Sequence, residues 1–244
     1  MTGYRKYSKK SLIIIKIILV LFAILFFAVI AVSAFFLISG YMMYSDAVSQ
    51  LSIKDRVETV RSNENFIHFF DLSEFYIDAV ISVEDHRFED HCGIDPIAVL
   101  RAVWTDIRTM SWTEGGSTIT QQVAKNLIFN QDKKIERKIA ECFAAFALES
   151  EYSKKEIFEL YVNTAYFGSD YYGIHDAAMG YFNKLPSELT DYEAAMLAGL
   201  PNAPSSYSPD INMELAKQRA SKVLQSMVSN NIITQEEADI ILNC

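Results

Sequence analysis

The chain has 244 residues, of which 50% are hydrophobic, and this suffices for one medium-sized domain together with a membrane segment. Its formal net charge is −9, and all 31 acidic residues follow an apolar N-terminal run that has five of the 22 basic residues before it or at its start. The part after the run is therefore strongly acidic, which argues against nucleic acid as a partner. Three cysteines, Cys92, Cys142 and Cys244, make no disulfide framework. We expect packing to stabilise the domain, with a Cys92–Cys142 bridge as the less favoured alternative.

The apolar run predicts a membrane anchor. Between Ile17 and Ile38 no residue is charged and only Ser33 is polar, and at 1.5 Å per residue the run spans about 30 Å, one bilayer core. A cleaved signal peptide has a shorter apolar region, so we expect an uncleaved anchor. Basic residues precede the run, and the positive-inside rule then places the N-terminus in the cytoplasm and everything after about Tyr44 outside.

We divide the chain into a cytoplasmic basic tail (1–11), a transmembrane anchor (12–39), a helical or irregular stalk (40–65) and an extracytoplasmic domain (66–244). After the stalk, caps and apolar periodicity predict helices almost throughout. The expected helices follow Ser73, run from Asp95-Pro96 to about Arg108, from Thr118 to Leu127 and from Glu136 to Glu151, follow Ser153 and Thr190, and cover Met213–Ser229 and Thr234–Leu242. Strand signals are weak and limited to Phe66–Phe70. The fold class is therefore mainly α, one compact domain on one anchor.

Glu84 is the first candidate catalytic residue. It extends the apolar stripe of the helix after Ser73, one turn beyond Val80. A carboxylate on an apolar face is desolvated on one side, which raises its pKa toward neutrality, as a general acid or base requires. The alternative is an ordinary acidic residue at a helix end.

A glycine turn, Gly115-Gly116-Ser117-Thr118, leads into a polar helix and exposes N–H groups that favour an anion. On one face of this helix lie Thr118, Gln121, Gln122 and Lys125, which offer contacts to sugar hydroxyls and phosphate. Such a turn by itself is usually only a loop.

A basic strip follows, with Lys125, Lys133, Lys134, Arg137 and Lys138 close together in an acidic domain. This strip is either an anion site or a solvated helix face. Arg137 and Glu141 are four residues apart and, in one interpretation, pair as a surface salt bridge worth little. In the alternative, Glu141 steadies a cation or sugar while Arg137 and Lys138 face phosphate. Neither His86 nor His91 has a partner at zinc-ligand spacing, so His91 is expected to hold its loop in shape.

These residues resemble the peptidoglycan glycosyltransferase (transglycosylase) family, which polymerises lipid II into glycan strands. The resemblance covers about Phe66 to Pro209 and consists of five ordered blocks. They are Glu84-Asp85 with Phe88, His91 and Gly93-Ile94-Asp95; Gly115 to Asn126; Arg137-Lys138 with Glu141; a helix ending in Tyr161-Val162-Asn163; and Tyr166-Phe167-Gly168 through Tyr181-Phe182.

The resemblance implies a lysozyme-like α lobe with a smaller membrane-proximal lobe, and a role for each matching residue. Glu84 would deprotonate the acceptor's 4-hydroxyl, and Lys125, Arg137 and Lys138 would neutralise the departing pyrophosphate. Glu141 would assist as a second catalytic residue, directly or through a divalent cation, Mg²⁺ or Mn²⁺. Substrate would be positioned by Ser117, Thr118, Gln121 and Asn163, and the loop supported by Asp85, Phe88, His91 and Gly93.

The implied partners are lipid II, the growing glycan chain, the membrane, and cell-wall elongation or division proteins. The implied location is the bacterial plasma membrane, crossed once. Two positions depart from the family pattern: Cys92 stands where proline is common, and Ser169-Asp170 where a basic residue is common. A chain ending at Cys244 is expected to be a monofunctional enzyme without a transpeptidase domain. Two rival interpretations are a lysozyme-type hydrolase or lytic transglycosylase and an inactive cell-wall scaffold.

Overall fold

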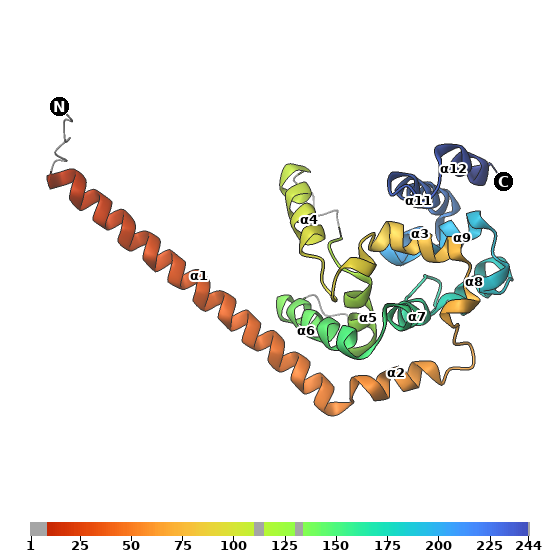
Figure 1. Ribbon diagram of the computed structural model, residues 1–244, viewed down its shortest axis with the longest axis horizontal. Helices are drawn as coiled ribbons and strands as arrows, with labels where there is room; N and C mark the ends of the chain where they lie inside the picture. The colour runs from red at the N-terminus through yellow and green to blue at the C-terminus, as the bar shows by residue number, and fades with distance from the viewer. Residues whose placement is uncertain (1–8, 110–114, 130–133, 244) are drawn as a thin grey trace.

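A computed structural model describes residues 9–109, 115–129 and 134–243 of the chain (Figure 1). The α-helices in these ranges are α1 (Lys9–Gln50), α2 (Ile53–Arg61), α3 (Glu74–Glu84), α4 (Pro96–Thr109), α5 (Ile119–Ile128), α6 (Ile135–Glu151), α7 (Lys154–Thr164), α8 (Ile174–Phe182), α9 (Asp191–Gly199), α10 (Pro204–Tyr207), α11 (Pro209–Ser229) and α12 (Gln235–Leu242). Four short 3₁₀ helices are η1 (Phe69–Asp71), η2 (Phe88–Asp90), η3 (Pro186–Glu188) and η4 (Leu200–Asn202). The mainly α fold with one long apolar helix is confirmed.

Side-chain caps explain where several helices begin, and the sequence predicts those at Ser73, Ser153 and Thr190. The side chains of Ser73, Thr118, Ser153, Thr190 and Thr234 each accept a hydrogen bond from the backbone N–H three residues on, which satisfies an otherwise unpaired donor. The helix expected at Met213–Ser229 forms the longer part of α11, and non-helical angles at Asn212 separate it from a short turn that begins at Pro209.

The strand expected near Phe66–Phe70 is wrong, and the described part of the chain contains no strand, only an isolated bridge between Tyr166 and Tyr172. Side chains of α7 take up the backbone groups that a neighbouring strand would have paired. Asn163 Oδ1 accepts from the N–H of Ile67 at 2.9 Å, and Glu159 Oε1 accepts from the N–H of Phe69 at 2.8 Å. The segment consequently runs extended along α7 and then turns into η1.

Helix α1 is long enough and apolar enough to cross a membrane, and its apolar side chains are exposed. It continues without a break to Gln50, past the expected end of the anchor at residue 39 (Figure 1). The expected stalk is therefore mostly helical, formed by the last turns of α1 and by α2.

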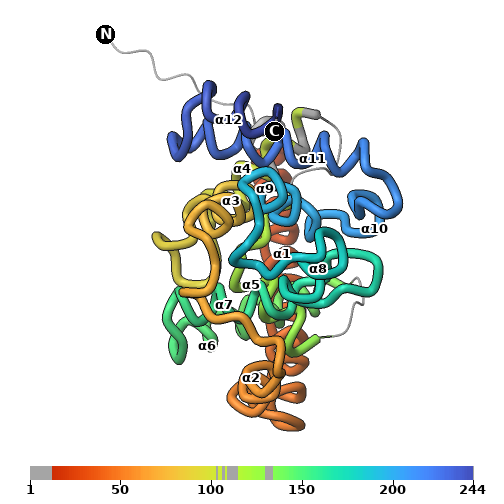
Figure 2. The backbone as a smooth tube through the Cα atoms, turned by 90° about the vertical axis from the view of Figure 1, so that its right-hand side faces the viewer, coloured from red at the N-terminus to blue at the C-terminus, as the bar shows by residue number. Residues whose placement is uncertain are grey.

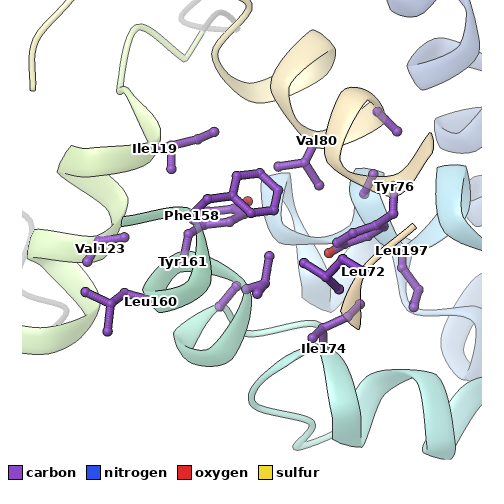
Figure 3. Close-up of a cluster of buried hydrophobic side chains, with 14 of the residues drawn as sticks. Leu72, Tyr76, Val80, Ile119, Val123, Phe158, Leu160, Tyr161, Ile174 and Leu197 are labelled. Atoms are coloured by element: carbon purple, nitrogen blue, oxygen red, sulfur yellow. The ribbon is translucent and has the colours of Figure 1, made fainter. Parts of the chain in front are cut away.

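The core lies where α3, α5, α7 and α9 meet, and α11 and α12 cover it on the side away from α2 (Figure 2). Tyr76 and Val80 from α3 face Phe158 and Tyr161 from α7, and Leu197 closes the cluster from α9 (Figure 3). Burying this stripe fixes α3 in the core and leaves its last residue, Glu84, at the edge of a cleft.

Candidate active site

A cleft of about 810 Å³ brings together residues that are far apart in the sequence. Its walls come from the end of α3, the glycine turn and α5, α6, α4 and α11. Of the candidate residues proposed from the sequence, the cleft lining includes Glu84, Asp85, Ser117, Thr118, Gln121, Lys125, Lys138 and Glu141. The first three sequence blocks thus form one site, with a carboxylate and several cations inside it.

Glu84 is held at the cleft wall by neighbours from α5 and α11. Its Oε2 accepts a hydrogen bond from Gln122 Nε2 at 2.8 Å, and its Oε1 lies 3.7 Å from a guanidinium nitrogen of Arg219. Burial raises the pKa of Glu84 and outweighs the lowering effects of Gln122, Arg219 and Lys125. The desolvation expected from the helix stripe is therefore confirmed, and the carboxylate is tuned to accept a proton.

Two buried tyrosines of the core lie near enough to Glu84 for its charge to act on them. Figure 3 shows the hydroxyl ends of Tyr76 and Tyr161 entering the apolar cluster from α3 and α7. Burial and then the charge of Glu84 raise the pKa of both phenols, so neither ionises beside the carboxylate. Nothing in the sequence periodicity distinguished these tyrosines from ordinary core residues.

Asp85 ties the loop after α3 to the start of α5. Its carboxylate oxygens lie 3.0 and 2.9 Å from His91 Nε2, and Oδ2 also accepts from the N–H of Ile119 at 3.0 Å. Phe88 is buried, and Lys154 Nζ lies 4.5 Å from its ring centre while donating to the carbonyl of His91 at 2.6 Å. Through these contacts Asp85, Phe88 and His91 hold the loop after α3 in place.

Gly93 and Thr118 join the same loop to α6 and α5. Gly93 has φ +87°, and a Cβ there would lie 3.0 Å from the carbonyl carbon of Ala145. Thr118 Oγ1 donates to the Gly93 carbonyl at 2.6 Å and caps α5, while Gln121 Oε1 accepts from the N–H of Thr118 at 3.1 Å. Gln121 Nε2 also contacts Cys142 Sγ at 3.2 Å. The polar atoms of Thr118 and Gln121 thus already bond within the protein.

The opposite wall of the cleft carries basic side chains. Lys138 Nζ lies 2.6 Å from Ser117 Oγ and 3.0 Å from Glu141 Oε2, and Arg137 lies 3.4 Å from Glu141 Oε1. The Glu141 side chain is only 2% exposed, so this is not the surface salt bridge considered above. Burial lowers the pKa of Lys125, which is partly offset by Glu141. Lys125 and Lys138 line this wall, whereas Arg137 does not line the cleft. Arg137 adds a third cation beside Glu141, so the net charge around this one carboxylate is positive.

Glu141 is a poor ligand for the divalent cation considered above. Its two oxygens face Arg137 and Lys138, and an added cation would compete with both. Within residues 9–109, 115–129 and 134–243, no group of three or more His, Cys, Asp or Glu side chains is placed to hold a metal ion. The described residues of the site therefore do not fit a metal ion.

Some candidates lie elsewhere. Asn163 does not line the cleft; its Nδ2 donates to the carbonyls of Ile67 and Glu159, both at 2.8 Å, so it holds the segment before η1. Lys133 lies outside the described residues. Cys92 and Cys142 are free thiols, so the alternative of a bridge between them is wrong.

Sequence reasoning missed the contribution of α11 and α4. Arg219 and Lys222 line the cleft from α11, and Arg101 lines it from α4. Arg219 also donates from Nε to the carbonyl of Gly199 at 3.0 Å, which fixes its guanidinium near Glu84. The three-residue spacing of Arg219 and Lys222 indicates a shared helix face, but it gives no sign of which site that face meets.

The fold and site thus define a membrane-anchored, mainly α protein with a buried carboxylate opposite a cationic wall. Residues 52–228 match the family model described as Transglycosylase. The chain belongs to this family, the peptidoglycan transglycosylases.

Several relatives and one solved structure show the extent of the similarity. The chain is 44% identical over 172 residues to penicillin-binding protein 1A of Aquifex aeolicus, covering 70% of this chain and 24% of that protein. It is 46% identical over 178 residues to penicillin-binding protein 1A of Neisseria lactamica (73% and 22%) and 41% identical over 172 residues to penicillin-binding protein 2D of Bacillus subtilis (70% and 25%). The crystal structure of penicillin-binding protein 1A from Haemophilus influenzae aligns with TM-score 0.36 and 30% identity over 51% of this chain and 15% of that one. The chain thus spans about a quarter of the length of these curated relatives.

Proposed function

We propose that this protein polymerises lipid II into the β-1,4-linked glycan strands of peptidoglycan. In this reaction the 4-hydroxyl of the acceptor sugar loses its proton and attacks the anomeric carbon of the donor chain. The bond from that carbon to the pyrophosphate oxygen breaks, the anomeric configuration inverts, and undecaprenyl pyrophosphate leaves. The observation that carries the proposal is the presence of a buried, protonatable carboxylate and a cationic wall in one cleft.

Glu84 is proposed as the general base. Its raised pKa makes the carboxylate a stronger proton acceptor than an exposed glutamate, which matches the need to deprotonate an alcohol during attack. The hydrogen bond from Gln122 and the nearby Arg219 orient the carboxylate without forming a tight ion pair that would weaken its basicity.

The cationic wall is proposed to stabilise the leaving pyrophosphate. Lys125, Arg137 and Lys138 would face the charge that grows on the departing group, where fixed cations lower the barrier most. Glu141 supports this role indirectly because it holds Arg137 and Lys138 in place. Ser117 is held by Lys138 at the same wall and would contact a phosphate oxygen.

The anchor fits a substrate that resides in the membrane. We propose the arrangement expected from the sequence, with residues 1–11 cytoplasmic, residues 12–39 spanning the bacterial plasma membrane and residues 66–244 outside, joined by the helical stalk at 40–65. Proteins of cell-wall elongation or division are proposed as partners on the same side. The growing glycan chain would occupy the cleft as donor.

The test is polymerisation of labelled lipid II by the detergent-solubilised full chain, run beside Glu84→Gln. We expect polymer from the wild type and a loss of about 10²- to 10⁴-fold in rate from the variant, since general base catalysis contributes roughly that factor. Glu89→Gln, an exposed neighbour in the same loop, is the matched control and should polymerise normally.

Two other results would overturn the proposal. Binding of lipid II by folded wild-type protein without any polymer would favour a scaffold. Shortening of pre-formed glycan would favour the hydrolase, an activity for which a pyrophosphate-binding wall has no use.

A further inference from the structure

Gly40 is the one buried residue of α1 among residues 13–50, the part of that helix whose exposure is described. It lies directly against α6. A Cβ at this position would lie 2.5 Å from Ile139 Cγ2 and 3.1 Å from the carbonyl oxygen of Glu136. Only a residue without a side chain allows two helices to approach so closely.

Two aromatic residues extend this contact along both helices. The Tyr41 ring meets the Phe143 ring edge to face at 5.3 Å, and the Tyr44 ring stacks on it at 6.3 Å. On α6 the contacting positions are Glu136, Ile139 and Phe143, which follow helical spacing. The end of the anchor thus lies along a full stripe of α6.

The same turns of α6 carry the cationic wall of the cleft. Arg137, Lys138 and Glu141 alternate in sequence with the positions that contact α1. Helix α1 therefore packs on one face of α6, and the opposite face of α6 carries the residues proposed to bind the pyrophosphate.

Arg56 fixes the end of α1 from a second direction. Its guanidinium donates to the carbonyls of Ala47 at 3.2 Å, Leu51 at 3.1 Å and Leu127 at 2.9 Å. Leu127 belongs to α5, two residues after Lys125. The two helices that carry Lys125, Arg137 and Lys138, α5 and α6, are thus both tied to the end of α1.

We propose that the anchor helix is part of the active-site scaffold, with Gly40 as a positioning residue that seats α6. The contact begins two residues after the apolar run ends at Ile38, so it lies at the membrane surface. A membrane lipid carries its phosphates at that level. The anchor would then fix the position of Arg137 and Lys138 relative to the membrane surface, in addition to retaining the protein at the membrane. This proposed role rests on the function proposed above. The family match begins at residue 52, so it does not include this contact.

The test is Gly40→Leu in the full chain, reconstituted in lipid nanodiscs. The added side chain cannot fit against Ile139, so α6 must shift away from α1. We expect faster amide exchange over residues 136–143 and a fall of about 10- to 100-fold in kcat for lipid II polymerisation, because small displacements of a catalytic group cost factors of this order. KM should change less than kcat, since the cleft walls from α3 and α11 are untouched.

The controls separate a local clash from general damage. Ala34→Leu adds the same kind of side chain to an exposed position of α1 and should change neither exchange nor kcat. Ile139→Ala combined with Gly40→Leu restores space and should recover both readouts.

Wild-type exchange and kcat in Gly40→Leu would overturn the proposal, and so would a loss of kcat that Ile139→Ala does not rescue. Amide exchange reports the contact even if the wild type makes no polymer, so failure of the contact and failure of the proposed activity are distinguishable.

Discussion

The two buried glutamates of the cleft have different surroundings, and their proposed roles differ accordingly. Glu84 accepts from one neutral donor, Gln122, at 2.8 Å, and Arg219 lies 3.7 Å away, so the effect of burial prevails and raises the pKa of Glu84. Glu141 lies 3.0 Å from Lys138 and 3.4 Å from Arg137 and forms an ion pair with each. A desolvated carboxylate is a stronger proton acceptor. A carboxylate that is paired with cations instead holds those cations in position.

These surroundings predict a bell-shaped pH dependence of kcat/KM. The base must be ionised, so activity is lost as the pH falls through the raised pKa of Glu84, at higher pH than for an exposed glutamate. Lys125 must be charged, so activity is also lost as the pH rises through its lowered pKa. Because the hydrogen bond from Gln122 lowers the pKa of Glu84, Gln122→Ala should move the acidic limb to higher pH.

The measurement is kcat/KM against pH at constant ionic strength for the wild type and Gln122→Ala. Asn126→Ala, an exposed position on the same helix, serves as the control and should leave the profile unchanged. An acidic limb that stays in place in Gln122→Ala would show that another group controls it.

At the level of elements, the site depends on how the loop after α3 is held. Asp85 connects that loop to α5, and Gly93 brings it against the backbone of α6. Thr118 completes the link by bonding the Gly93 carbonyl while capping α5. These contacts connect the loop after α3 to both α5 and α6. They therefore fix the position of Glu84, at the end of α3, relative to the basic residues of α5 and α6.

Gly93→Ala should break this connection. The added Cβ meets the Ala145 backbone at 3.0 Å, and φ +87° is unfavourable for any residue with a side chain. We expect a loss of about 1–3 kcal/mol in the free energy of unfolding, measured by chemical denaturation in detergent. Gly115→Ala is the matched control, because a Cβ there meets nothing within 4 Å. Equal losses in the two variants would contradict this explanation.

At the level of the whole molecule, charge and hydropathy divide the chain at α1. Basic residues lie before the apolar run, the acidic residues lie after it, and the family match begins at residue 52. The anchor is nevertheless continuous with the domain, because α1 extends to Gln50 and contacts α6. The membrane segment and the matched domain are therefore connected by packing as well as by the chain.

The proposed orientation predicts that Cys92, an exposed thiol, faces the outside of the cell. A membrane-impermeant maleimide should label it in intact cells, as read by mass spectrometry of the peptide that contains it. Thr2→Cys, on the other side of the anchor, should be labelled only after the membrane is permeabilised. Labelling of position 2 but not of Cys92 in intact cells would show the opposite orientation and contradict the proposal.

Much of this protein follows from local sequence signals. The apolar run predicts the anchor, and the predicted caps Ser73, Ser153 and Thr190 coincide with three helix starts. The apolar stripe that ends at Glu84 predicts the desolvation of this carboxylate. Each of these properties depends on residues within a turn or two of one another, where helix geometry and side-chain chemistry suffice.

Other features depend on contacts between distant segments, which only the tertiary structure decides. Arg219 reaches Glu84 because α11 packs on α3, and Asn163 is kept from the cleft because the segment before η1 occupies its hydrogen bonds. Gly40, which the sequence presents as one more small residue at the end of an apolar run, becomes the point where the anchor meets α6. Periodicity states which face of a helix is buried, but the partner of that face is set by packing across the whole domain.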